Sequence, residues 1–310
     1  MSSYVDDTRV TRCMATPSTD CAALQQDLQA VYDWAEDVNM IFNGDKFEAL
    51  RFWPRAAPKP PNSYLDPDGN PIQEKNSLRD LGVQISSDLS FSVHIDQVVA
   101  SASKLVGWTL RTFRRRSRFL MLTVWKSLIQ SKLDYCSQLW SPSDQANISR
   151  LEGVAKNFTS RVAGMDGLDY WERLSTLGMY SQERRRERYQ IIFIWKLSQG
   201  HVQGYKLPFY ESDRRGLLVA LPPMAQRSPT AVRRAREASL KVKGARLFNL
   251  VPQELRGLTG VCVDTFKAAL DSWLAGIPDQ PTIQGRQRAA RNNSLIDQVV
   301  ANHVEFDVKV

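Results

Sequence analysis

The stretch Tyr4-Val5-Asp6-Asp7-Thr8 places two adjacent carboxylates in a short run of apolar and small polar residues. Successive side chains of a β-strand point to opposite faces, so a continuous strand would separate these two acids. A tight hairpin turn beneath them would instead present at least one carboxylate at an exposed tip. Hard divalent cations such as Mg²⁺ usually take one or two carboxylates together with substrate phosphates. The stretch therefore predicts a hairpin that either binds Mg²⁺ or forms an ordinary solvated turn.

The charge of the chain favours a polyanionic partner. Its 310 residues are enough for two domains or one large one. The formal net charge is +8, and the isoelectric point is near 9.4. Because counterion release drives the binding of basic proteins to polyanions, this surplus favours nucleic acid over a membrane surface. A soluble basic protein without such a partner has the same composition.

The cysteines are typical of a reducing compartment. Cys13, Cys21, Cys136 and Cys262 are scattered without paired spacing, which argues against a disulfide framework and against a zinc site. No N-terminal signal pattern is visible, and the longest apolar run, near 191–195, is too short to cross a bilayer. We therefore expect an intracellular protein, nuclear or cytoplasmic, with no membrane partner.

The first 90 residues mix helix and antiparallel strand. Apolar residues recur at helical spacing from about residue 24 to residue 38, and Asn43-Gly44 is expected to end this helix. Alternating patterns predict strands over 47–52 and 81–86, with a tight turn at 67–69. The period then changes to 3.6 residues, so the domain boundary is expected between 86 and 92.

The rest of the chain is mainly helical at first and irregular later. Residues 91–200 show four helical patterns joined by short connections, which favours a bundle of antiparallel neighbours. In residues 201–310 prolines interrupt the pattern, 227–246 is rich in basic residues, and a last helix is expected over 265–274. The fold class is therefore α+β, with strands and one helix followed by a helical bundle and a basic, partly disordered tail.

The order of several motifs resembles the reverse transcriptases of non-LTR retrotransposons, of the jockey and RTE type. The acidic pair is similar to their polymerase C motif, Asn43-Gly44-Asp45-Lys46 to their D motif, and Leu78-Arg79-Asp80-Leu81-Gly82-Val83 to their primer grip. Later stretches resemble their thumb and C-terminal part. These are 127–129, 133–136, 139–140, 170–174, 183–189 and 264–271.

The resemblance implies roles for five residues. Asp6 would hold the catalytic Mg²⁺ ions, and Asp7 would ligate weakly or shape the metal site. Lys46 would lie near the incoming triphosphate and protonate the leaving pyrophosphate. Leu81 and Gly82 would steady the primer end. Two metal ions that clamp the attacking and leaving oxygens require carboxylate ligands, and a lysine suits a phosphate as a point charge.

The resemblance also implies that a partner aspartate is missing. In that family the A motif precedes the C motif and supplies another carboxylate, whereas only Met1, Ser2 and Ser3 precede Tyr4. We therefore expect a C-terminal fragment, palm edge plus thumb, that does not polymerise DNA alone. It would bind dNTP only together with an upstream region. The implied partners are an RNA template and a DNA primer, and the oligomeric state stays open.

The arginine-rich stretch 111–118 predicts where nucleic acid binds. No acid lies between Asp96 and Asp134, so the cations between them cannot all be paired locally. The alternative is a solvated face whose charges complement a helix C-terminus. In the run 183–188, by contrast, interspersed glutamates favour pairing within the helix. The candidate nucleic-acid-binding residues are Lys104, Arg111, Arg114, Arg115, Arg116 and Arg118.

Three functions remain open at this point. The first is the C-terminal part of a retrotransposon RNA-directed DNA polymerase. The second is a non-catalytic nucleic-acid-binding protein derived from such an element. The third is a helical protein-interaction domain in which the acidic pair has no catalytic role.

Overall fold

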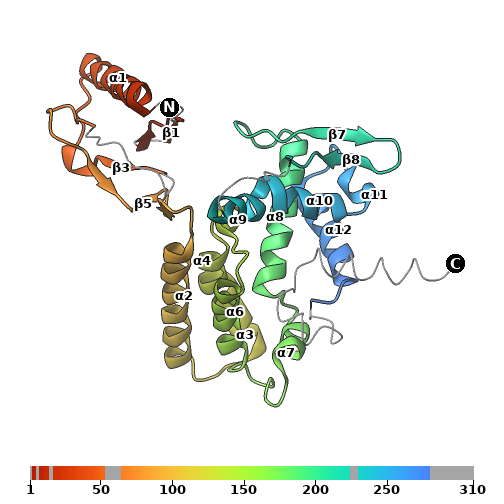
Figure 1. The fold of residues 1–310 in the computed structure, drawn as a ribbon. Coiled ribbons are helices and arrows are strands. Elements are labelled where there is room, and N and C mark those ends of the chain that lie inside the picture. Colours follow the sequence, from red (N-terminus) through yellow and green to blue (C-terminus); the bar gives the residue numbers. More distant parts are fainter. Residues whose placement is uncertain (1, 5–6, 14–16, 53–63, 224–229, 280–310) are drawn as a thin grey trace. The chain divides into compact units, whose positions relative to one another are not determined.

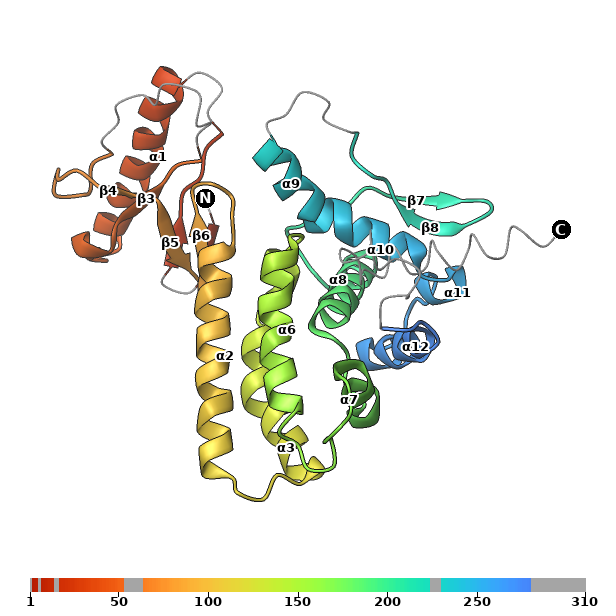
Figure 2. The same ribbon diagram turned by 60° about the horizontal axis from the view of Figure 1, so that its bottom comes forward.

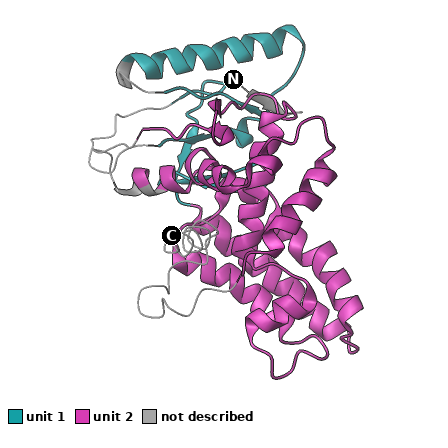
Figure 3. Ribbon diagram, turned by 90° about the vertical axis from the view of Figure 1, so that its right-hand side faces the viewer, with its two compact units in different colours: residues 1–90 teal, residues 91–310 magenta. Residues whose placement is uncertain are grey.

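The computed structural model describes residues 2–4, 7–13, 17–52, 64–223 and 230–279. The chain divides into two compact units, unit 1 (Met1–Ser90) and unit 2 (Phe91–Val310), which are coloured separately in Figure 3. The division falls inside the interval 86–92, where the hydrophobic period changes. Residues 91–200 and 201–310 belong to the same unit, although the sequence had favoured a separate C-terminal region.

Unit 1 consists of one long helix and pairs of short strands. The pairs are β1 with β2, β3 with β4, and β5 with β6. The aromatic rings of Tyr32, Phe42 and Phe47 pack edge to face, with centroids 5.7 to 5.9 Å apart. The elements are β1 (Ser2–Tyr4), β2 (Asp7–Arg9), α1 (Pro17–Asp37), η1 (Gly44–Lys46), β3 (Glu48–Leu50), β4 (Gln73–Lys75), β5 (Ser77–Asp80) and β6 (Val83–Ser86).

The end of α1 differs from the prediction. The helix ends at Asp37, and the chain turns through Asn39, which adopts a positive φ of 53° that asparagine tolerates better than most residues. Asn43-Gly44 was therefore the wrong stop signal. Its real role is local, because the Asn43 side chain accepts a hydrogen bond from the Asp45 backbone N–H at 3.0 Å and caps η1.

The pairing of β3 also differs from the prediction. It runs parallel to β4, in the register Glu48↔Gln73 to Leu50↔Lys75, whereas we had expected antiparallel strands throughout unit 1. Ion pairs reinforce the parallel register, since Lys75 contacts Glu48 and Arg51 contacts Glu74. The turn at 67–69 forms as predicted, with Gly69 at a φ of 81°.

Unit 2 is mainly helical (Figures 1 and 2). A π-helical segment, η2, joins α3 to α4, so that residues 118–134 form one continuous helical stretch. The elements are α2 (Ser92–Thr112), α3 (Arg118–Val124), η2 (Trp125–Ile129), α4 (Gln130–Asp134), α5 (Ser137–Trp140), α6 (Gln145–Thr159), α7 (Tyr170–Leu177), α8 (Gln182–Ser198), β7 (Phe209–Ser212), β8 (Gly216–Val219), α9 (Thr230–Ala238), η3 (Leu240–Gly244), α10 (Ala245–Leu250), α11 (Gln253–Arg256) and α12 (Val263–Ala275).

Helices α2 and α6 lie side by side and run in the same direction (Figure 2). At their first turns the Asn147 side-chain amide donates to Ser92 Oγ at 3.2 Å. At their far ends the backbone N–H of Ala163 donates to the carbonyl of Arg116 at 2.8 Å. The apolar faces of α2, α3, η2, α4 and α6 meet in a core that includes Trp125 and Phe158, whose ring centroids are 4.8 Å apart.

The region after residue 200 is more ordered than the sequence indicated. Between 201 and 279 the chain forms a β7–β8 hairpin and several helices, and it shares a hydrophobic core with α8. Trp195 of α8 stacks on Phe266 of α12, with ring centroids 4.3 Å apart. Leu247 and Phe248 of α10 are fully buried in the same core. The expectation of an irregular basic tail is therefore wrong for 201–223 and 230–279.

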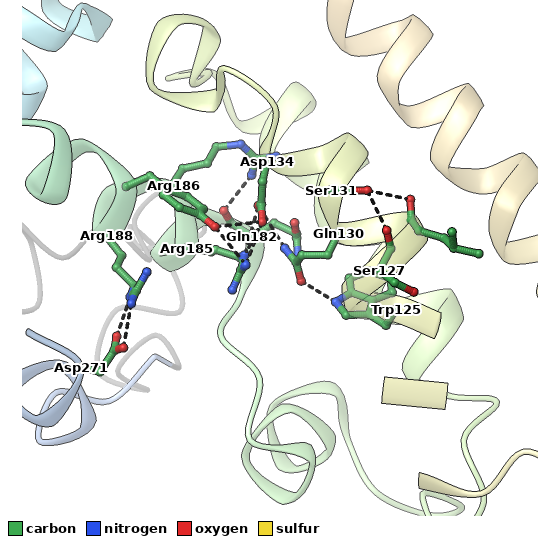
Figure 4. A network of polar contacts seen from close by, with 12 residues as sticks. Trp125, Ser127, Gln130, Ser131, Asp134, Gln182, Arg185, Arg186, Arg188 and Asp271 are labelled. Carbon is green, nitrogen blue, oxygen red and sulfur yellow. Dashed lines mark hydrogen bonds and ion pairs between the residues drawn. The ribbon is translucent and has the colours of Figure 1, made fainter. Parts of the chain in front are cut away.

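The arginines in the first half of α8 form a network with neighbouring elements (Figure 4). Arg185 donates to both carboxylate oxygens of Asp134 in α4, at 2.8 and 3.0 Å, and Arg188 donates to both oxygens of Asp271 in α12, at 2.5 and 2.7 Å. Arg184 is buried and donates to backbone carbonyls at residues 277 and 278. Pairing within the helix, which we had predicted for 183–188, is therefore not the main use of these arginines.

Buried acids of this network have raised pKa values. Glu152 of α6 accepts a hydrogen bond from the Tyr170 hydroxyl at 2.5 Å and another from the Glu183 backbone N–H at 2.9 Å. Burial raises the pKa of Glu152 above its ordinary value despite these two donors. Burial, together with the charge of Glu187, raises the pKa of Glu183 to about 7. Burial also lowers the pKa of Arg186 to about 10, so this guanidinium stays protonated at neutral pH.

We predict that the substitution Asp134→Ala destabilises unit 2 by about 3 kcal/mol, because it leaves the Arg185 guanidinium without its bidentate partner. The matched control is Asp264→Ala, which removes an ion pair with Lys267 from a side chain that is 86% exposed. This control should shift the free energy of unfolding by less than about 0.5 kcal/mol. Urea unfolding followed by tryptophan fluorescence measures both variants, and equal losses would contradict the assigned role of the network.

We also predict that Glu183→Gln stabilises the protein at high pH. A folded-state pKa near 7, above the ordinary value of 4.5, means that the folded state holds more protons between these two values. Stability therefore falls as pH rises through this window, and glutamine mimics the protonated acid. The melting temperature of the variant should exceed that of the parent at pH 8 and approach it at pH 4.5. The same substitution at the exposed Glu211 is the control, and an equal gain at both pH values would refute the assignment.

Candidate nucleic-acid interface

Strands β1 and β2 lie on either side of Val5 and Asp6 in the sequence. Strands β1 and β2 pair antiparallel in the register Ser2↔Arg9, Ser3↔Thr8 and Tyr4↔Asp7. These two strands are the described arms of the hairpin that the sequence predicted. Asp6 lies outside the described residues, and of Asp7 only the backbone is described.

The predicted Mg²⁺ site stays a prediction. Among the residues that the structure describes, no group of three or more His, Cys, Asp or Glu side chains is placed to hold a metal ion. The described part of the hairpin is joined to β5 by an ion pair between Arg9 and Asp80. This contact brings β2 close to β5, the first strand of the hairpin whose turn contains the predicted primer-grip residues.

Lys46 is the last residue of η1, and its side chain is exposed. Within the described part of unit 1, no hydrogen bond or ion pair joins it to the β1–β2 hairpin. An exposed lysine beside the α1–β3 connection is accessible to a phosphate, as the predicted role requires. That role stays a prediction.

The sequence pattern predicts a strand over 81–86, but Leu81 and Gly82 lie outside any strand. They form the two-residue turn between β5 and β6, with φ angles of 43° and 85°, and β6 begins at Val83. Positive φ at both central residues is the geometry of a type I′ hairpin turn, which suits glycine but is uncommon for leucine. The alternating pattern was therefore extended two residues too far. The role of this turn at a primer end stays a prediction.

Five of the six predicted nucleic-acid-binding residues have exposed side chains on one part of unit 2. Lys104 and Arg111 lie seven residues apart on α2, which places them on the same face about 10 Å apart along the helix. Arg114 and Arg115 lie in the connection to α3, and Arg118 begins α3. Within the described ranges none of these five forms an ion pair, so their positive charge faces solvent.

Arg116 has a different role from the other five. Its Nη2 donates to the carbonyl of Leu110 in the last turn of α2, at 3.3 Å, and its own carbonyl accepts from Ala163. A cation at this position interacts favourably with the negative end of the helix dipole. Helix capping, the alternative that the sequence left open, therefore applies to this residue, and it is removed from the candidate surface.

Sequence reasoning missed the aromatic residues of this surface. Trp108 lies on α2 between Lys104 and Arg111 at helical spacing, and it is 46% exposed. Phe119, the second residue of α3, is 83% exposed. The signal was present in the sequence as aromatic residues interleaved with arginines, a pattern common in nucleic-acid-binding surfaces. We define the basic–aromatic surface as Lys104, Trp108, Arg111, Arg114, Arg115, Arg118 and Phe119.

Comparisons with known proteins point to mobile elements. No family model matches the chain, and no solved structure matches it. The RNA-directed DNA polymerase from the mobile element jockey of Drosophila melanogaster is 23% identical over 167 residues, which cover 53% of this chain and 18% of that protein. The probable RNA-directed DNA polymerase from the transposon X-element of the same organism is 23% identical over 180 residues, covering 57% of this chain and 19% of that protein.

The chain thus spans less than a fifth of the length of these curated relatives. No helix among the described residues combines the length and the apolar character needed to cross a membrane. About half of the chain is distantly related to the RNA-directed DNA polymerases of non-LTR mobile elements.

Proposed function

We propose that this chain is the palm-edge and thumb part of a retrotransposon RNA-directed DNA polymerase, and that unit 2 binds the RNA template and DNA primer. The distant relationship to mobile-element polymerases supports the parent activity. The order of the C, D and primer-grip motifs in unit 1 supports the placement toward the C-terminal end of such an enzyme.

The observation that carries the proposal is the uncompensated charge of α2, α3 and their connection. Between Asp96 and Asp134 the chain contains lysines and arginines but no acid. Five of these cations are exposed and, within the described residues, form no ion pair. Such a surface gains free energy when a polyanion displaces its counterions, and arginine forks match phosphate oxygens.

Unit 1 would contribute the metal site of the parent polymerase. Asp6 and Asp7 would bind Mg²⁺, Lys46 would contact the triphosphate, and Leu81 with Gly82 would contact the primer. The family that the chain resembles also uses an aspartate from its A motif, and no stretch of these 310 residues resembles that motif. The second candidate function is a non-catalytic nucleic-acid-binding protein, because the basic–aromatic surface belongs to unit 2 and requires no residue of unit 1.

We predict that binding to an RNA–DNA hybrid weakens steeply with added salt. The double substitution Arg114→Ala/Arg115→Ala should lower affinity and reduce the slope of log K against log[salt] by about 2, roughly one for each lost phosphate contact. Fluorescence anisotropy of a labelled hybrid from 50 to 200 mM salt (about the range where such effects are large) measures both quantities.

The matched control is Arg214→Ala/Arg215→Ala, which removes two adjacent exposed arginines from the turn between β7 and β8. It makes the same change in net charge at a different place. A flat salt response of the parent chain, or equal losses in the two double variants, would refute binding at the basic–aromatic surface.

We further predict that these 310 residues alone do not extend a primer. In the family that the chain resembles, an A-motif aspartate helps to hold the two metal ions of phosphoryl transfer, and no stretch of this chain resembles that motif. A purified preparation supplied with Mg²⁺, dNTPs and a primed RNA template should bind the template without adding nucleotides. Extension that is lost in Asp6→Asn would show instead that the chain carries a sufficient metal site.

A further inference from the structure

The aromatic side chains of the basic–aromatic surface are exposed without an evident structural reason. Phe119 lies 83% exposed in the first turn of α3, whereas its helical neighbours Met121 and Val124 are buried in the core. Trp108 is 46% exposed and touches Phe113 edge to face, with ring centroids 6.1 Å apart. Exposed apolar side chains that gather on one part of a surface mark sites that bind other molecules.

The rings lie among cations rather than beside an apolar groove. Lys104, Trp108 and Arg111 follow one another at spacings of four and three residues, which brings them to one face of α2. Phe119 directly follows Arg118, and only the short connection 113–117 separates the two helices. Flat π-faces are thus interleaved with positive charges over 16 residues of chain.

The surroundings do not neutralise this surface. The loop after α6 contacts Arg116 through Ala163, and residues 160–169 contribute Arg161, Asp166 and Asp169, a net charge of −1 against the five exposed cations. The surplus of positive charge therefore remains. A partner must be polyanionic and must also offer flat faces to the rings.

We propose that the basic–aromatic surface binds single-stranded nucleic acid, with Phe119 and Trp108 stacking on unpaired bases while the arginines contact phosphates. This inference rests on the proposed function and names the form of nucleic acid that the surface binds more tightly, because the arginines contact the phosphates of single strands and duplexes alike. In a duplex the base faces are stacked on one another, so an exposed ring finds no face to pack against. In a single strand each base offers a π-face, and arginines can contact the backbone on either side.

The test compares three oligonucleotides of equal length by fluorescence anisotropy with the full chain: a single-stranded RNA, the matching duplex, and a strand whose sites are abasic. We expect the parent to bind the single-stranded RNA more tightly than the duplex. The variant Phe119→Ala should lose about tenfold in affinity for the single strand, the scale of one stacked base, and keep its affinity for the duplex and the abasic strand. Trp108→Ala should show the same selectivity.

The matched control is Leu139→Ala, which removes an apolar side chain that is 56% exposed on α5, outside the surface. It should leave all three affinities unchanged, and melting curves should show that every variant is folded. If Phe119→Ala weakens all three oligonucleotides equally, or none, stacking is refuted. If the arginine double variant still loses affinity in that case, the proposed function stands and only this inference fails. If the parent binds no oligonucleotide, both fail.

Discussion

The arrangement of unit 2 depends on helix α8, whose first half carries charges that the fold cannot leave unpaired. Burying a guanidinium or a carboxylate costs several kcal/mol of desolvation free energy unless partners replace the lost hydration. The partners come from separate elements. Asp134 in α4 pairs with Arg185, and Asp271 in α12 pairs with Arg188. Glu152 in α6 accepts from the Glu183 backbone N–H and stabilises the charge of the buried Arg186. Because each partner must reach its own position along α8, these contacts fix which helices surround it, while the apolar second half supplies the shared core with α10 and α12.

Two arginine-rich segments thus have opposite roles in one unit. The arginines at 184–188 are held by acids and carbonyls from distant parts of the chain, and they stabilise the fold. The cations at 104–118 lie in a stretch without acids, and five of the six predicted residues keep exposed side chains. The difference does not lie in the number of arginines. It lies in whether the fold brings an acid or a carbonyl group to each of them, and this separates a surface available to a polyanion from a structural network.

Much of the local structure followed from the sequence because it depends on near neighbours. The pairing of β1 with β2 and the helical patterns that became α2 and α8 follow from periodicity and turn residues. The incorrect predictions concern contacts between residues far apart in the sequence, or positions where two local patterns favour different structures. The parallel pairing of β3 with β4 joins residues 25 apart, and the partners of Arg185 and Arg188 lie 51 and 83 residues away. At Leu81 an alternating pattern favoured a strand, but the hairpin turn required a positive φ there.

The same limits apply to the candidate site. Spacing and charge were enough to predict the cations of α2 and α3, but not to separate Arg116, which turns back to cap α2, from its exposed neighbours. The basic composition of 240–250 also gave no indication that this segment belongs to the core. Its buried residues Val242, Leu247 and Phe248 lie among lysines and arginines in the sequence. In both cases the orientation of a side chain decides its role, and that orientation depends on tertiary packing.

Our central claim is that residues 104–119 form the nucleic-acid interface, whereas the arginines of α8 stabilise the fold. The most direct test is photo-crosslinking of the full chain to an RNA that carries photoreactive bases, with the adducts located by mass spectrometry. Our account predicts adducts on peptides that contain Trp108 and Phe119, and none on the α8 peptides between 182 and 190. Adducts concentrated in α8, or their absence from 104–119, would contradict the assignment of the nucleic-acid interface.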